Sequence, residues 1–373
     1  MTDDGRQTRA AAAPGPRDDL AADGPDEMGR ELASGPATVE ATLSALARRR
    51  DAPSTLIGKA RRVQVLGTGA SLAVARCAEP LLRASDRDAG RTRPLVVCEA
   101  SEAVMGPPDR EMFRPDDWVV AVSKSGVSPE IVGASRRALA VGAHVVAVTS
   151  NDTSLLAKLA HEVVPVPIGE ERGAATKSAL GALAALLAMW DLVERKVPGS
   201  RVLVRDLESA VRDWEAARTI GREMAVARRI WFAGFGAACG AAEAGGLLWH
   251  EKVGRPAVHT TPSGFRHGPI EAAGSEDAIV LVEIDPPSPV RNEYMRLLSG
   301  ECQSVGVEQI WVSHERPPAG RWLALLADEA PGRALEAYVR LQQLARGAAH
   351  AAGTYRDGFA VLGSVVRTSA AFE

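Results

Sequence analysis

Short, largely apolar runs alternate along the chain with longer stretches rich in Ala, Leu and Gly. Runs that stay apolar over so short a length are typical of strands buried on both faces, and the longer stretches predict helices. The expected strands are Val63–Leu66, Trp118–Val122, Val145–Val148, Ile230–Ala233, Ile279–Val282 and Ile310–Val312. The alternation predicts an α/β protein whose parallel sheets are covered by helices on both faces.

The pattern of strands and helices occurs twice. Ala60–Ser71 and Ala227–Ala238 share six of twelve residues at a constant offset of 167, and each predicts a strand, a glycine turn and the start of a helix. Two later strand regions are repeated in the same order: residues 116–122 match 276–282, and residues 142–149 match 306–313. This self-similarity indicates two copies of one α/β unit.

A break rich in Pro and Gly, Val197–Ser200, separates the two copies and is the expected domain boundary. We therefore expect a first domain over residues 26–197 and a second over residues 198–373. Residues 1–25 mix Ala, Pro, Asp and Arg without an apolar stretch, which predicts a disordered tail. Asp26–Ala47 carries apolar residues at helical spacing with a Gly-Pro interruption, and it predicts one kinked helix or two short ones.

Composition argues against several functional classes. The 373 residues are enough for two domains, and 46% hydrophobic with 24% charged residues is an ordinary globular balance. A net charge of −3 gives no electrostatic attraction to nucleic acid or anionic membranes, and Ala179–Trp190 is too short to span a bilayer. The four cysteines form no CxxC pair. We expect a cytoplasmic protein without a cofactor, a metal, a nucleic-acid partner or a membrane partner.

Ser123–Glu130 follows an expected strand and has the sequence Ser-Lys-Ser-Gly-Val-Ser-Pro-Glu. Ser128 as N-cap and Pro129 as first helical residue predict that a helix begins here. The free amides and the positive dipole end of such a helix favour a phosphate, which the serine hydroxyls would surround. Turns from strand to helix are commonly rich in Ser and Gly, so a simple helix cap is the alternative.

The second copy lacks these hydroxyls. Ser71 corresponds to Ala238, and Ser123 corresponds to Glu283. The comparison predicts that an anion site is specific to the first copy. A nucleotide site is not expected, because neither a Walker loop nor a complete dinucleotide-binding glycine pattern is present.

The Ala/Gly/Leu-rich helix of the second copy is expected to end at Glu251 and Lys252, because Gly254 and a proline follow. A carboxylate there faces the negative end of the helix dipole among apolar neighbours, so both effects should raise the pKa of Glu251. Such a group can serve as a general base, and an exposed surface glutamate is the alternative. His267 follows in a loop, and histidine is the residue type suited to proton transfer at neutral pH, whereas His250 is interpreted as structural.

Four features together resemble the sugar isomerase (SIS) family, over residues 26–368. They are the Gly-x-Gly-x-Ser turn at Gly67–Ser71, the Ser-x-Ser-Gly-x-Ser loop at Ser123–Ser128, Glu170 followed by Gly173–Lys177, and the spacing of Glu251 from Arg266–Pro269. The chain is most similar to the isomerase half of glucosamine-6-phosphate synthase and to aminosugar-phosphate deaminase/isomerases, without the glutamine-hydrolysing domain. The resemblance implies two tandem SIS-type α/β/α units of flavodoxin-like topology.

The resemblance also implies roles for individual residues. The residues that it places around the substrate and its 6-phosphate are Thr68, Ser71, Ser123, Lys124, Ser125, Ser128 and Glu170. It implies that Glu251 is the base that moves a proton between C1 and C2, and that His267 assists ring opening. In this family the histidine reaches across from the neighbouring subunit, so a homodimer with a shared active site is expected. An anchored phosphate and an acid/base pair suffice for this chemistry without a metal.

Three departures from the family pattern change the expected chemistry. Leu248 stands where the synthase has a lysine, and Ala175 stands where it has a serine. Lys252 is the last lysine of the chain, so the C-terminal lysine that forms a Schiff base has no counterpart. The reaction would then use the free carbonyl of the substrate, an amine of the substrate, or an elimination after C2 deprotonation.

We therefore expect an enzyme that abstracts the C2 proton of an aminosugar 6-phosphate of the glucosamine or N-acetylglucosamine type. Aldose–ketose isomerisation with or without deamination is the first hypothesis, and elimination of water from an N-acetylhexosamine 6-phosphate is the second. A non-catalytic sugar-phosphate sensor is the third. DNA binding is not expected, because the segment before Ala60 lacks a basic recognition helix.

Overall fold

The structure is a computed structural model that describes residues 26–48, 57–58, 60–106, 112–195 and 199–361. Two five-stranded sheets, one in each unit, have only parallel strand pairs. The first unit has the strand order β2-β1-β3-β4-β5, with β1 (Arg62–Gly67), β2 (Leu95–Glu99), β3 (Asp117–Val122), β4 (His144–Thr149) and β5 (Glu162–Pro165). The second unit has the matching order β7-β6-β8-β9-β10, with β6 (Ile230–Gly234), β7 (Val258–Thr260), β8 (Ala278–Val282), β9 (Glu308–Ser313) and β10 (Arg321–Ala324).

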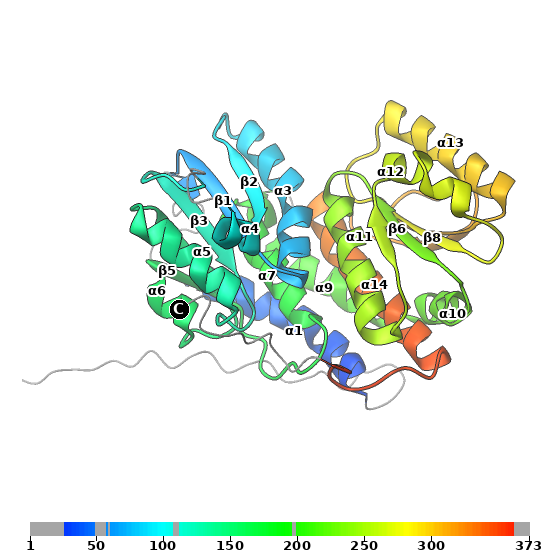
Figure 1. Ribbon diagram of the computed structural model, residues 1–373, viewed down its shortest axis with the longest axis horizontal. Coiled ribbons are helices and arrows are strands. Elements are labelled where there is room, and N and C mark those ends of the chain that lie inside the picture. Colours follow the sequence, from blue (N-terminus) through cyan, green and yellow to red (C-terminus); the bar gives the residue numbers. More distant parts are fainter. Residues whose placement is uncertain (1–25, 49–56, 59, 107–111, 196–198, 362–373) are drawn as a thin grey trace, which may run out of the picture.

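Helices surround both sheets (Figure 1). Those of the first part of the chain are α1 (Glu27–Ala47), α3 (Ala70–Asp88), α4 (Ala100–Met105), α5 (Pro129–Ala140), α6 (Leu155–Leu159), α7 (Lys177–Met189) and α8 (Leu192–Arg195). Those that follow are α9 (Gly199–Arg212), α10 (Glu215–Met224), α11 (Ala237–Leu248), α12 (Pro262–Arg266), α13 (Pro289–Val305) and α14 (Ala330–Ala351). A π-helical turn, η2 (Trp249–Val253), continues α11, and a short 3₁₀ turn, η3 (Pro269–Ala272), follows α12.

Strand β3 illustrates why the strands are apolar on both faces. Val120 and Val122 face the main core, whereas Val119 and Ala121 face a second cluster formed with α4 and α5. Both sides are therefore sealed from water, as a parallel sheet requires. The predicted α/β fold class with two repeated parallel units is confirmed.

The stretch Asp26–Ala47, predicted as one kinked helix or two short ones, contains a single helix, α1, with Pro36 inside it. Asp26 caps it, because its carboxylate accepts a hydrogen bond of 2.6 Å from the Gly29 amide. The expected tail over residues 1–25 and the expected boundary at residues 197 and 198 lie outside the described residues. Within the described part of the chain, no helix combines the length and the apolar character needed to cross a bilayer.

Helices α3 and α11, which are equivalent in the two copies, pack together where the units meet (Figure 1). Arg76 Nη1 lies 2.8 Å from Glu243 Oε1, and these residues are 167 positions apart, which is the offset of the repeat. A Cβ atom on Gly240 would lie 2.1 Å from the Cys77 amide nitrogen. Only glycine allows this backbone approach, which brings the second unit close to the first.

The start of α1 is bound to α14 and to the segment that follows it. Asp26 forms an ion pair of 2.8 Å with Arg346, and the Glu27 amide donates a hydrogen bond of 3.1 Å to Asp357. Lys252, from η2, donates hydrogen bonds to the carbonyl oxygens of Arg356 and Gly358 at 3.3 and 3.1 Å. These contacts hold residues 355–358 next to both α1 and η2.

Candidate active site

The serine loop, Ser123–Ser128, connects β3 to α5 and is shaped by its own hydroxyl groups. Ser123 Oγ accepts a hydrogen bond of 3.1 Å from the Gly126 amide, and Ser125 Oγ accepts one of 3.3 Å from the Val127 amide. Gly126 has φ +64°, and a Cβ atom there would lie 2.1 Å from Ser154 Oγ. Ser123 and Ser125, two of the predicted phosphate ligands, therefore stabilise the conformation of the loop as acceptors. Each hydroxyl still has its own proton to donate to a ligand.

Ser128 occupies the N-cap position of α5 and Pro129 follows it, as the sequence predicts. The Ser128 side chain nevertheless makes no capping hydrogen bond to α5. Its hydroxyl is therefore not committed to the helix end. This favours the phosphate interpretation of the loop over a simple cap.

The turn between β1 and α3 lies across from the serine loop. Thr68 Oγ1 is buried without a hydrogen-bond partner among the described residues. Ser71 and Lys124 line one small cavity together with Thr149 and Ser150. This cavity measures about 30 Å³, room for roughly one water molecule, so a sugar phosphate could enter only if some of the lining side chains move.

The second unit provides an internal comparison for this cavity. Trp118 in β3 and Ala278 in β8 are equivalent, because each pairs with the matching residue of β1 or β6. Counting seven residues on from each, Ser125 is equivalent to Asp285. Asp285 Oδ2 accepts a hydrogen bond of 3.2 Å from the Ala237 amide at the start of α11.

A carboxylate thus occupies the amide end of α11, whereas the corresponding end of α3 is open. A Cβ atom on Gly236 would lie 2.1 Å from Asp285 Oδ2, but a Cβ atom on Gly69 would meet nothing within 4 Å. The amides at a helix start favour a negative group. The difference supports an anion site in the first unit.

Lys124 is held by Glu171, a residue that the sequence analysis did not single out. Lys124 Nζ lies 2.9 Å from Glu171 Oε2 and donates a hydrogen bond of 3.0 Å to the Glu171 carbonyl. The fully buried carboxylate of Glu171 also accepts hydrogen bonds from the amides of Thr176 and Ser178, at 3.1 and 2.9 Å.

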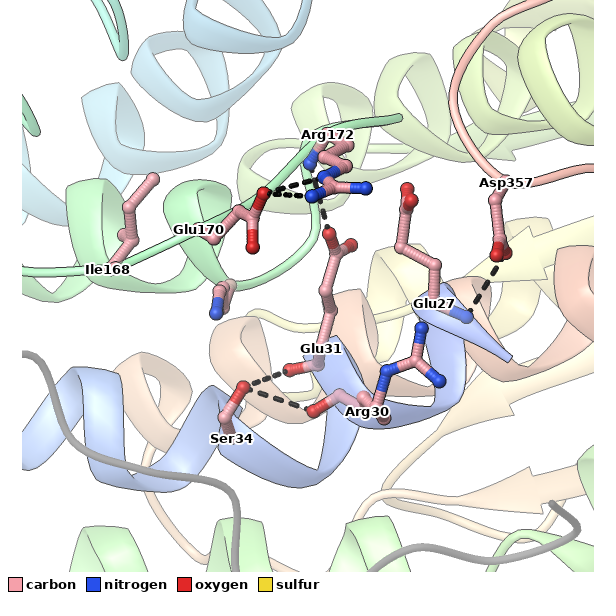
Figure 2. A pocket seen from close by; sticks show the side chains of 10 residues that line it. Glu27, Arg30, Glu31, Ser34, Ile168, Glu170, Arg172 and Asp357 are labelled. Atoms are coloured by element: carbon pink, nitrogen blue, oxygen red, sulfur yellow. Dashed lines mark hydrogen bonds and ion pairs between the residues drawn. The ribbon is translucent and has the colours of Figure 1, made fainter. Parts of the chain in front are cut away.

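Glu170, the predicted substrate ligand, points elsewhere. Its carboxylate is exposed, lies 2.5 Å from Arg172, and lines a different cavity of about 450 Å³ (Figure 2). The structure therefore brings Glu171, and not Glu170, to Lys124. No periodic pattern in this loop indicates which of two adjacent acids turns inward.

Glu251 lies in the π-helical turn η2. The helical stretch was expected to end at Glu251 and Lys252. That was wrong, because a widened turn carries it to Val253 before Gly254, at φ +68°, ends it. Burial raises the pKa of Glu251 to about 7, although Lys252 and Lys124 lower it and Glu171 raises it further. A carboxyl group of the second unit is thus within electrostatic reach of Lys124 in the first.

His250 has a structural contact and does not act as a second base. Its Nε2 accepts a hydrogen bond of 2.8 Å from the Ala257 amide, so it fixes the chain after η2, in agreement with its structural interpretation. Among the described residues, no group of three or more His, Cys, Asp or Glu side chains is arranged to hold a metal ion.

His267 lies at the end of α12 and is exposed. From β6 the chain runs back along α11 to Glu251 and then forward along β7 to His267. Glu251 therefore lies near the amino-terminal ends of these strands, and His267 lies near their carboxyl-terminal ends. In Figure 1, α12 is well separated from α5, where the serine loop ends. One chain alone therefore does not bring His267 to Glu251 and Lys124.

Comparisons with known proteins agree with this architecture. Residues 56–190 match the SIS domain model. Glutamine–fructose-6-phosphate aminotransferase (isomerizing) of Sulfolobus acidocaldarius is 26% identical over 267 residues, which cover 69% of this chain and 43% of that protein. The match thus spans less than half of that relative.

Solved structures have similar folds at low sequence identity. Tagatose-6-phosphate ketose/aldose isomerase from Escherichia coli has a TM-score of 0.78 at 20% identity, with 90% of this chain and 96% of that chain covered. The C-terminal domain of glucosamine-fructose-6-phosphate aminotransferase from Francisella tularensis has a TM-score of 0.74 at 19% identity, with 89% and 98% covered. Glucosamine-6-phosphate deaminase from Thermotoga maritima has a TM-score of 0.69 at 16% identity, with 91% and 99% covered.

The resemblance inferred from the sequence is confirmed by the matching domain model and by these folds. Residues 56–190 match the SIS domain, and the chain shares its two-unit fold with the tagatose-6-phosphate isomerase and the aminotransferase domain.

Proposed function

We propose that this protein is an enzyme that acts on an aminosugar 6-phosphate by abstraction of the C2 proton. The observation that carries the proposal is the partly buried carboxyl group of Glu251, whose pKa burial raises to about 7 within electrostatic reach of Lys124 of the other unit. A base with a pKa near the working pH combines a large ionised fraction with good proton affinity. Aldose–ketose isomerisation, with or without loss of ammonia, is the reaction class that fits the folds it shares with an isomerase and a deaminase.

The phosphate of the substrate would bind between the serine loop and the start of α3. Ser128 and Ser71 would donate hydroxyl protons, and Lys124 would supply a positive charge. The support comes from the second unit, where the Asp285 carboxylate takes the equivalent place at the start of α11. A bound phosphate would then fix the sugar so that C2 reaches Glu251.

His267 would open the sugar ring in the active site of a second copy of the chain. Its exposure and its distance from the serine loop within one chain support this arrangement (Figure 1). The functional assembly would be a homodimer with two shared sites.

Lys252 would not replace the family's C-terminal lysine as an imine-forming amine. Its ammonium group is buried and is bonded to the carbonyl oxygens of Arg356 and Gly358. The carbonyl of the substrate would therefore stay free during proton transfer.

Proton exchange tests the proposal. The protein is incubated in heavy water with glucosamine 6-phosphate or N-acetylglucosamine 6-phosphate, and the C2 proton is followed by NMR while the product mixture is analysed. We expect exchange or turnover by the wild type, and a loss of roughly 10²- to 10⁴-fold in Glu251→Gln with sugar-phosphate binding retained. Glu293→Gln, which alters an exposed glutamate of α13, is the control.

The products separate the remaining alternatives. A ketose phosphate indicates isomerisation, free ammonia indicates deamination, and an unsaturated N-acetylhexosamine phosphate indicates dehydration. If the wild type binds these sugar phosphates but catalyses neither exchange nor turnover, and Glu251→Gln binds them equally well, the protein is a sensor and the enzymatic proposal is wrong.

A further inference from the structure

Glu31 connects the second cavity to the serine loop. Its side chain, which is 5% exposed, belongs to α1 and lines the cavity of about 450 Å³ (Figure 2). Glu31 Oε2 lies 2.6 Å from Thr176 Oγ1, and the same Thr176 oxygen lies 2.9 Å from Glu171 Oε1. Glu171 in turn holds Lys124. A continuous series of polar contacts therefore runs from Glu31 through Thr176 and Glu171 to Lys124.

The two contacts of Thr176 require a proton on one of the carboxyl groups. A threonine hydroxyl carries one proton and can donate it to only one oxygen. Thr176 Oγ1 lies within hydrogen-bond distance of a carboxylate oxygen on each side. One of the two carboxyl groups must therefore be protonated and donate to Thr176.

Glu31 is the group that carries this proton. Glu171 has the Lys124 ammonium and two backbone amides as partners, all of which favour its ionised form. Among the described residues, Glu31 has only the Arg172 amide, at 3.3 Å, in addition to Thr176. Burial and then the charges of Glu171 and Glu27 raise the pKa of Glu31 to about 7, against the lowering effect of the Arg172 amide.

The remaining charged side chains around Glu31 come from every element that borders the cavity. They are Glu27 and Arg30 from α1, Glu170 and Arg172 from the loop after β5, Lys177 from the start of α7, and Asp357 from the segment after α14. In Figure 2, the Arg172 guanidinium pairs with Glu170, and only the Arg172 backbone amide reaches Glu31. Among the described residues, the Glu31 carboxyl group has no salt bridge of its own.

We propose that Glu31 is a positioning residue whose proton orients the Thr176 hydroxyl toward Glu171 and thereby holds Lys124 in place at the serine loop. Loss of that proton leaves two carboxylates competing for one hydroxyl proton. It also adds a negative charge close to Lys124, which weakens the binding of an anion there. Binding at the serine loop then falls as the pH rises. The inference rests on the proposed function only in that the serine loop binds the substrate phosphate.

Sulfate binding tests this inference without catalysis. Sulfate is a tetrahedral dianion that does not titrate between pH 6 and 8.5, whereas phosphate does. The titrations are done in a Glu251→Gln background, because Glu251 ionises over the same range. We expect the sulfate affinity of this variant to fall by roughly threefold to tenfold between pH 6 and 8.5.

A second substitution, Glu31→Gln, should abolish this pH dependence and keep the low-pH affinity, because the glutamine amide donates to Thr176 at every pH. Glu27→Gln is the matched control, since Glu27 lines the same cavity and has no hydrogen bond to Thr176. It should retain the pH dependence, shifted to lower pH because the charge of Glu27 contributes to the raised pKa of Glu31. An unchanged slope in the Glu31→Gln variant would overturn the inference.

Direct titration of Glu31 keeps the inference testable if a variant fails to fold. Carbon-13 NMR of the labelled full-length protein, assigned by comparison with Glu31→Gln or by through-bond spectra, should show Glu31 ionising near pH 7. Ionisation near 4.5 would overturn the inference whether or not the protein is an enzyme. Ionisation near 7 together with no turnover on any sugar phosphate would instead leave the inference standing and reject the proposed function.

Discussion

Two glutamates in different units, the partly buried Glu251 and the buried Glu31, have pKa values raised to about 7. Burial is the largest cause for both, but their partners differ. The ammonium groups of Lys252 and Lys124 lower the pKa of Glu251 and partly offset the effect of its burial. The carboxylates of Glu171 and Glu27 instead raise the pKa of Glu31 further. At the residue scale the site therefore contains one group suited to accept a proton and another suited to keep one.

The acidity of Glu251 predicts the pH dependence of the reaction. A base must be ionised to accept the C2 proton, so kcat/KM should rise with pH and level off above about 7. The sugar phosphate itself titrates nearby, so the profile is compared with that of a phosphonate analogue of the substrate. A rate that is already maximal at pH 5 would contradict the role of Glu251.

The acidity of Glu31 predicts a pH effect on stability. The folded pKa of about 7 lies above the usual value of 4.5, so the folded state binds the proton more tightly than the unfolded state. The stabilisation is fully present below pH 4.5 and is lost as the pH rises through about 7. Relative to Glu31→Gln, the wild type should lose up to about 3 kcal/mol of unfolding free energy across this window, measured by urea denaturation.

The individual site residues were only partly predictable from the sequence. Ser128 was assigned to the helix start on local grounds, because capping depends on neighbouring residues. The choice between Glu170 and Glu171 depended on which side chain meets Lys124 and α1, segments distant in the sequence. The same is true of Glu31, whose importance arises from Thr176.

At the element scale, the strands were predictable because burial on both faces leaves a continuous apolar signal, and the repeat fixed their order. The widened turn η2 was not predictable from the local pattern, and its Lys252 bonds with residues 354–358, which are distant in the sequence. This turn contains Glu251. The least predictable local structure is thus the one that carries the proposed base.

The close contact between α3 and α11 predicts a steric effect of substitution. Gly240→Ala would put a methyl group 2.1 Å from the backbone of α3, and should lower the unfolding free energy by roughly 1–3 kcal/mol or more. Gly300→Ala is the matched control, because Gly300 lies in the exposed part of α13 with nothing within 4 Å. It should stabilise by up to about 1 kcal/mol, because alanine favours the helix.

Comparison of Gly240→Ala with the Gly300→Ala control shows which result would contradict the prediction. Thermal or urea denaturation of both variants is compared with the wild type. Equal stabilisation by the two alanines would mean that α3 and α11 are further apart than the structure places them.

At the scale of the whole molecule, the separation of Glu251 and His267 predicts complementation between inactive variants. Glu251→Gln and His267→Ala should each be inactive as homodimers. When they are mixed after subunit exchange, half of the dimers are mixed and each contains one intact site, so roughly a quarter of wild-type activity should return. No recovery, with subunit exchange verified by mass spectrometry, would place both residues in one chain's site or remove His267 from catalysis.

The Asp285 carboxylate at the start of α11 has a consequence for the duplicated architecture. The later half of the protein carries its own counter-ion, so an anion such as sulfate finds no open place at the start of α11. The part of any rise in melting temperature that comes from anion binding at these helix starts should therefore originate in the earlier half. The two copies thus differ in one property: the helix start of the first is open to an anion from solution, and that of the second is already occupied by a side chain of the protein.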